Sequence, residues 1–221
     1  ANNLNTNDVV FSWTYDGDQP TVSIAAVNTE GELVTDGAVT NDLKLILTLT
    51  SSEPTTNFDQ TDITVKGASL SNFSATSSSV YSVDLTPISD GAITLSVKAN
   101  RFNDSSNNNN IASTEFNWTY DSTVPTITGN SLASDNSTIA VTFSEAVYNS
   151  AAGSGALAAN DFALSISGGT ATLSSSTPSS ISVSSNTYTL GISLSGSPNG
   201  SETITVNPVT NSIYDIAGNV A

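Results

Sequence analysis

Short runs of alternating hydrophobic and polar residues recur along the whole chain. In the run LKLILTLTSSE, residues 43–53, leucines at every second position share one face of an extended strand. The run STIAVTFSE places Ile139, Val141 and Phe143 in the same way. Strict alternation over a short run is typical of a half-buried β-strand, and no stretch has the spacing of an amphipathic helix. The pattern therefore predicts an all-β protein.

The chain contains the same unit twice. FSWTYDGDQPT, residues 11–21, nearly recurs as FNWTYDSTVPT, residues 116–126, and Trp13 and Trp118 lie 105 residues apart. Further pairs follow in the same order: the two runs above, DITV with DFALSI, YSVDLTP with TYTLGISL, and DGAITLSVKA with NGSETITVNP. Turn residues separate these runs about every ten residues, which is typical of a seven-strand Greek-key sandwich.

We therefore predict an all-β fold of two tandem immunoglobulin-like Greek-key β-sandwich domains. The first covers residues 16–120 and the second covers residues 121–221. Almost no linker separates them, because the last strand of the first domain runs directly into the first strand of the second. Such a joint is expected to be stiff.

The aromatic residues of the repeated phrase are predicted to lie in a core. Phe116, Trp118 and Tyr120 occupy alternate positions, so all three point to one face of a strand. The alternative is an exposed aromatic surface on which sugars stack. Core packing is favoured because all three rings lie on the face of the strand that is expected to point inward.

Residues 1–15 resemble the last strand of a unit, with Val9, Phe11, Trp13 and Tyr15 on one face. In the second domain the DIAGN turn is followed by two residues only, so this domain is expected to lack its own last strand. Two explanations fit. The chain, which starts with Ala, is a piece of a longer tandem array, or it is a subunit whose N-terminal strand completes the next molecule by β-strand addition.

The composition excludes several classes of protein. Among 221 residues there are 20 acidic and 4 basic residues, giving a net charge of -16, with no His and no Cys. Without His there is no Ser-His-Asp triad and no His-bearing zinc site, and we expect no enzyme. The negative charge disfavours nucleic acid and anionic membranes and favours divalent cations. No apolar run is long enough for a membrane span.

Carboxylates are expected to meet at one pole of each domain. In a seven-strand sandwich the first strand starts there, and the second and sixth strands end there. This rule groups two sets of three carboxylates: Asp121, Glu145 and Asp215 in the second domain, and Asp16, Glu53 and Asp104 in the first. Three carboxylates repel one another unless a cation lies between them, and oxygen ligands suit Ca²⁺. The alternative is that the aspartates cap turns and the glutamates are solvated.

Four segments carry a family resemblance: WTYDSTVPT, SSEPTTNFDQTDITV, PISDGAITLSV and DIAGN. They resemble the bacterial immunoglobulin-like repeats of large secreted adhesins and other cell-surface proteins, and the first domain does so more closely. The resemblance implies extracellular display, a spacer or adhesive role, and calcium between modules. It supports the second carboxylate set and adds Asn219. The first domain departs from the family pattern because NDSSNNNN keeps Asp104 but lacks the Gly that permits a positive φ.

Together these observations predict an extracellular structural protein whose modules join head to tail into a stalk or filament stiffened by calcium. Its expected partners are copies of itself or neighbouring repeats, without nucleic acid and without direct membrane insertion. The alternative is a lectin-like adhesin module that binds surface glycans through the insertion YNSAAGSGALAAND, residues 148–161. The small residues of that insertion are also typical of a plain surface loop.

Overall fold

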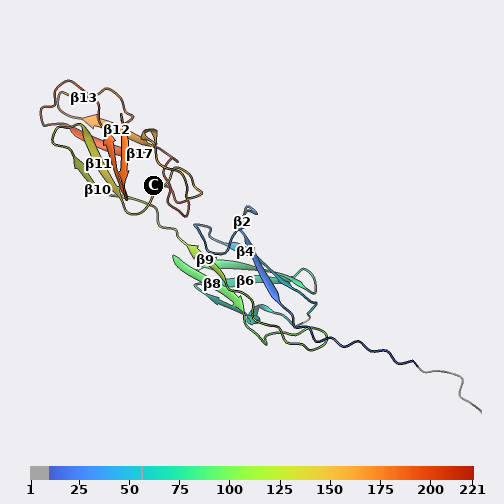
Figure 1. Cartoon of the computed structure of the whole chain (residues 1–221). Coiled ribbons are helices and arrows are strands. Elements are labelled where there is room, and N and C mark those ends of the chain that lie inside the picture. Colours follow the sequence, from blue (N-terminus) through green and yellow to red (C-terminus); the bar gives the residue numbers. More distant parts are fainter. Residues whose placement is uncertain (1–9, 56) are drawn as a thin grey trace, which may run out of the picture.

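The computed structural model describes residues 10–55 and 57–221, which form two β-sandwich units arranged end to end (Figure 1). The strands of the first unit are β1 (Val22–Val27), β2 (Leu33–Val34), β3 (Ala38–Thr40), β4 (Leu45–Ser51), β5 (Ile63–Lys66), β6 (Ala68–Ala75), β7 (Val80–Pro87), β8 (Gly91–Val97) and β9 (Phe116–Tyr120). Those of the second unit are β10 (Ile127–Leu132), β11 (Thr138–Phe143), β12 (Phe162–Ser167), β13 (Thr172–Leu173), β14 (Ile181–Ser184), β15 (Thr187–Gly191), β16 (Leu194–Ser195) and β17 (Thr203–Pro208). Short 3-10 helices, Gln60–Asp62 and Ala159–Asp161, precede β5 and β12. The predicted all-β class is confirmed.

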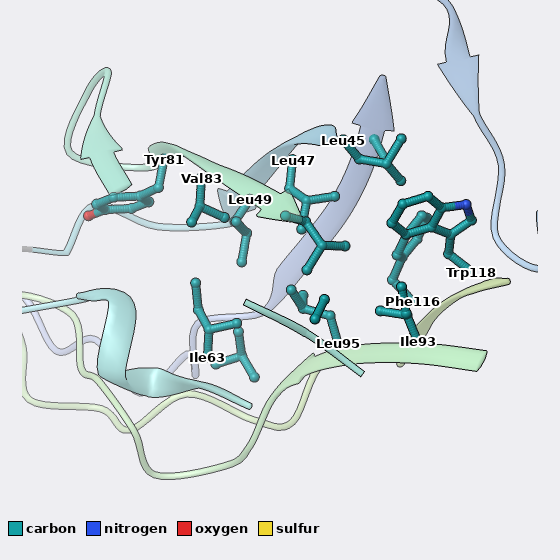
Figure 2. Packing of buried hydrophobic residues seen from close by; sticks show 14 of the residues in the cluster. Leu45, Leu47, Leu49, Ile63, Tyr81, Val83, Ile93, Leu95, Phe116 and Trp118 are labelled. Carbon is teal, nitrogen blue, oxygen red and sulfur yellow. The ribbon is translucent and has the colours of Figure 1, made fainter. Parts of the chain in front are cut away.

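Two sheets enclose the core of the first unit. One sheet has the strand order β2-β1-β4-β7-β6 and the other has the order β3-β9-β8-β5. The side chains of Leu45, Leu47 and Leu49 on β4 are fully buried, and they face Ile93 and Leu95 of the opposite sheet (Figure 2). The alternation in the sequence thus places one apolar face of β4 between the sheets.

Strand β9 completes this core with the aromatic residues of the repeated phrase. Phe116, Trp118 and Tyr120 are 6%, 1% and 8% exposed, which confirms the prediction that they pack in a core. β9 pairs antiparallel with β8 and parallel with β3. The indole Nε1 of Trp118 donates a hydrogen bond to Oγ1 of Thr40, at 3.1 Å.

The second unit has a less complete second sheet. Strands β10-β11-β15-β14 form one sheet, whereas β12 pairs with β17 alone and β13 pairs with β16. Its core includes Ile139, Val141 and Phe143, which are nearly fully buried. Among the described residues no strand lies along the second edge of β17.

The structure differs from the seven-strand expectation in both units: among the described residues the first has nine strands and the second has eight. In the first unit the additional strands, β2 and β3, lie in the segment between β1 and β4. A turn at residues 28–32 with Gly31 at a φ of 86° folds β2 back onto β1. β3 then crosses to the other sheet and pairs with β9. The alternation in these two- and three-residue strands is too short to be recognised in the sequence.

Residues 10–15 extend away from the first unit on the side opposite the second unit (Figure 1). Phe11, Trp13 and Tyr15 are 83%, 72% and 79% exposed, so the copy of the aromatic phrase near the N-terminus does not pack in a core of this chain. It forms no strand here, because a strand requires a neighbour for its backbone hydrogen bonds. Val9, predicted to share this face, lies outside the described residues.

Candidate metal centres at the domain poles

The carboxylates of the second domain meet where the two units join. Asp121 follows β9 directly, Glu145 follows β11, and Asp215 lies in the turn after β17. Each of the three contributes a carboxylate oxygen, and these oxygens all lie within 4.8 Å of one another. Asp215 is fully buried. The structure therefore brings together the three side chains that the strand order grouped.

Asn219 holds this cluster in place through hydrogen bonds. Its backbone N–H donates to Oδ1 of Asp215 and its side-chain Nδ2 donates to Oδ2, both at 2.8 Å. The same Nδ2 donates to the backbone carbonyl of Asp121, at 2.9 Å. Asn219 thus fixes the buried aspartate against the end of β9. Its Oδ1 accepts a hydrogen bond from Nδ2 of Asn41 in the first domain, at 3.0 Å.

The first domain has a matching cluster at its opposite pole. Oxygens of Asp16, Glu53 and Asp104 also lie within 4.8 Å of one another. Asn108 donates from its backbone N–H and from Nδ2 to the two oxygens of Asp104, at 2.8 and 3.0 Å. Its Nδ2 also donates to the backbone carbonyl of Asp16, at 3.2 Å. Asn108 therefore donates to its two aspartates as Asn219 does in the second domain.

Sequence reasoning missed Asn108, although a signal was present. Both turns have an aspartate followed four positions later by an asparagine, namely Asp104 with Asn108 and Asp215 with Asn219. The absent glycine does not alter the turn, because Asn107 adopts a φ of 67° where Gly218 has 92°. Asparagine enters the left-handed region more readily than other residues with a side chain. The turn of the first domain therefore differs from the family pattern in residue type but keeps the positive φ.

Burial, hydrogen bonds and neighbouring acidic groups shift the pKa values of three carboxylates in the clusters. Burial raises the pKa of Glu145, and the negative charges of Asp215 and Asp121 raise it further. Burial also raises the pKa of Glu53, with smaller contributions from a hydrogen bond to Asp104 and from neighbouring charges. Burial also raises the pKa of Asp104, but hydrogen bonds from Asn108 and Ser106 have a larger opposite effect, so the pKa of Asp104 is lowered overall. Each cluster thus combines an aspartate held by amide donors with a glutamate that resists ionisation.

The geometry of both clusters is compatible with one calcium ion. Calcium binds oxygen at 2.3–2.6 Å, so two ligand oxygens on opposite sides of the ion lie about 5 Å apart. The separations within each cluster do not exceed this limit. Turn-capping hydrogen bonds, the alternative interpretation, are present as well: Oδ1 of Asp121 accepts from the backbone N–H of Thr123, at 3.0 Å, and Oδ1 of Asp16 accepts from that of Asp18, at 3.2 Å. Calcium binding stays a prediction.

The two domains contact each other directly beside the second cluster. The N–H of Asp121 donates to the carbonyl of Thr40, and the N–H of Asn41 donates to the carbonyl of Ala217, both at 3.1 Å. Asp90 of the first domain accepts hydrogen bonds from the hydroxyls of Ser122 and Thr123, at 2.7 and 2.8 Å. The first residues of the second domain are therefore bonded to the pole of the first.

The insertion at residues 148–161 packs at this joint. The backbone of Tyr148 pairs with that of Tyr214, next to the turn that carries Asp215. Ala151 and Ala152 line a shallow cleft together with residues 39–42 of the first domain. A role of this insertion in binding glycans stays a prediction.

The described residues contain no helix that is long and apolar enough to cross a membrane. Two β-sheets packed face to face, with the edge strand β3 parallel to β9, define the first unit as an immunoglobulin-like domain. Residues 16–120 match the family described as the bacterial Ig-like domain, so the first domain belongs to that family. No curated protein and no solved structure matches the chain. The resemblance drawn from the sequence is confirmed for the first domain, and it identifies a type of module that is commonly exposed at cell surfaces and is typically non-catalytic.

Proposed function

We propose that this chain is an extracellular structural protein in which Ig-like domains joined head to tail form a stalk or filament. The observation that carries the proposal is the joint between the domains. Tyr120 lies in the core of the first domain, and the next residue, Asp121, belongs to the carboxylate cluster of the second. No free linker residue separates them, so bending the joint requires that buried contacts or hydrogen bonds break.

We further propose that calcium stiffens this joint. An ion bound by Asp121, Glu145 and Asp215 would connect the end of β9 to two loops of the second domain. The net charge of -16 favours cation binding, and the mutual repulsion of the three carboxylates supports it at this position. The cluster of Asp16, Glu53 and Asp104 would bind a second ion at the other pole of the first domain.

Small-angle scattering and thermal unfolding in calcium and in EDTA test the proposal. Calcium is expected to raise the melting temperature and to keep the maximum dimension of the particle at that of two domains end to end. Glu145→Gln should reduce both responses, whereas Glu115→Gln, at an exposed position on the first domain, should leave them unchanged. If EDTA alters neither the melting temperature nor the scattering curve, calcium stiffening is wrong. A compact or widely variable particle in both conditions would refute the stalk itself.

A further inference from the structure

The second domain has an open groove at the position that β9 occupies in the first domain. Strands β8 and β17 correspond, because β8 pairs with β5 through Ile63 and Val97, and β17 pairs with β12 through Phe162 and Pro208. In each domain the first strand of this pair, β5 or β12, directly follows a 3-10 helix. β8 has β9 on its other edge, whereas among residues 10–55 and 57–221 no strand pairs with that edge of β17.

Apolar side chains remain accessible in this groove. On β8 the inward-facing residues Ile93, Leu95 and Val97 are at most 1% exposed, whereas Ile204 and Val206 on β17 are only partly buried. Three adjoining hollows follow β17 along the open side of the core, between this strand and the sheet of β10 and β11. Their apolar lining includes Ile127, Leu132, Ile139, Val141, Ile204 and Val206.

The segment FSWTY, residues 11–15, has the sequence that fills this position in the first domain. It differs from β9, FNWTY, only at Ser12, which corresponds to the outward-facing Asn117. Its three aromatic side chains are more than two thirds exposed, and its backbone has no strand partner. Trp13 and Tyr15 already form an edge-on pair with ring centroids 6.4 Å apart, as Trp118 and Tyr120 do at 5.9 Å.

We propose that residues 11–15 of one molecule insert as a strand into the groove of the second domain of another molecule. This assignment rests on the proposed head-to-tail function and names the partner as a second copy of this chain. The pairing of Trp118 with Ile93 and of Phe116 with Leu95 sets the register. By correspondence, Trp13 pairs with Ile204 and Phe11 pairs with Val206. Backbone hydrogen bonds to β17 supply affinity, and the aromatic side chains fix the register.

The acceptor has to be another molecule. Oδ2 and the backbone carbonyl of Asp16 accept hydrogen bonds from Ser106 and Asn108, which fixes the C-terminal end of the segment at the pole away from the second domain (Figure 1). Five extended residues span at most about 18 Å, so the segment cannot pass the first domain to reach its own second domain. Because donor and acceptor surfaces lie at opposite ends, each molecule binds the next and the assembly is an open filament.

Sedimentation of the full chain tests this assembly. The wild-type chain is expected to form concentration-dependent oligomers at micromolar concentration in calcium. Phe11→Ser combined with Trp13→Ser should give only monomers, and it should leave the fold intact because both side chains are exposed. Ser12→Ala combined with Thr14→Ala changes only side chains on the outward face of the inserted strand, so this variant should assemble like the wild type. Oligomers that persist unchanged in the aromatic double variant would overturn the proposal.

A peptide experiment locates the acceptor. A labelled peptide of residues 10–16 is added to the full-length aromatic double variant, whose groove is available. It should bind saturably and slow amide hydrogen exchange in residues 203–208 but not in residues 91–97. Trp13→Ser in the peptide should weaken binding by about tenfold or more. Absence of binding, or protection elsewhere than in residues 203–208, would overturn the assignment of residues 11–15 to this groove. If the chain is an extended monomer that does not bind the peptide, the inference fails and the stalk function stands.

Discussion

Trp13 and Trp118 occupy equivalent positions in two copies of one phrase, and the structure predicts opposite consequences for their removal. Trp118 is 1% exposed and donates a hydrogen bond to Thr40, whereas Trp13 is 72% exposed. Trp118→Ala should therefore destabilise the first domain strongly. Trp13→Ala should leave the stability of the monomer nearly unchanged.

The magnitudes follow from burial. A Trp side chain removes about 150–250 Å² from water, and truncation of a buried one to Ala costs about 3–5 kcal/mol. The lost hydrogen bond to Thr40 adds about 1 kcal/mol. We thus expect about 4–6 kcal/mol for Trp118→Ala, and a change within about 0.5 kcal/mol for Trp13→Ala, since exposed substitutions rarely exceed this.

Urea unfolding followed by circular dichroism measures both variants at a protein concentration below that of self-association. The remaining tryptophan in each variant gives a second readout, because Trp118 reports the unfolding of the first domain by fluorescence whereas Trp13 does not. Thr40→Val removes the acceptor for Trp118 and also for the backbone N–H of Asp42, so it should cost about 1–2 kcal/mol. Equal destabilisation by Trp13→Ala and Trp118→Ala would refute the reasoning, because it would require a core contact for Trp13.

Four further variants test two carboxylates and two turns. In EDTA at neutral pH, Glu145→Gln should stabilise the second domain by about 1 kcal/mol in urea unfolding, because it removes like-charge repulsion; a loss of stability would contradict this. Backbone hydrogen bonds from Asn199 and others lower the pKa of Glu202 from 4.5 to about 2, so the stability it contributes is present above pH 4.5 and is lost as the pH falls toward 2. Between pH 4.5 and 2 the unfolding free energy of Glu202→Gln should fall less than that of the wild type. Parallel pH profiles of stability for the two proteins would contradict this prediction. Gly218→Ala should reduce stability by more than about 2 kcal/mol, since a Cβ there would lie 2.8 Å from a backbone oxygen. Gly31→Ala, at a similar φ but in open space, should cost only about 1–2 kcal/mol. Equal losses of stability in the two variants, measured by thermal unfolding, would show that the close contact at Gly218 has no effect.

Alternation in the sequence was sufficient to predict β4 and β9 because each has one buried face. The buried leucines of β4 and the buried aromatics of β9 occupy the inward parity that the pattern assigned to them. Strands β2 and β3 were not predictable in this way, because two or three residues carry no detectable period. Their positions depend on a turn and on the available edge of β9, which are tertiary features.

The carboxylate clusters were predictable as sets of residues because strand order alone determines which loops share a pole. What the sequence did not reveal is how the aspartates are held. Asn108 acts through backbone and amide donors, and its chemistry is ordinary for a turn, so only its spacing from Asp104 marks it. The left-handed conformation of Asn107 likewise depends on the folded turn and not on residue type alone.

Strand insertion and calcium binding would be coupled, because one short segment takes part in both. In the chain itself Tyr120 is buried in the first core and Asp121 enters the next cluster, so an ion bound by Asp121 restrains the strand that precedes it. Tyr15 and Asp16 repeat this pair of residues in the sequence, so insertion of residues 11–15 would bury Tyr15 and hold Asp16 in the same way. Linkage then requires that if calcium strengthens the association of two molecules by some factor, association strengthens calcium binding by the same factor. Calcium affinities measured on assembled chains and on the monomeric aromatic variant should therefore differ by the factor that separates the association constants in calcium and in EDTA.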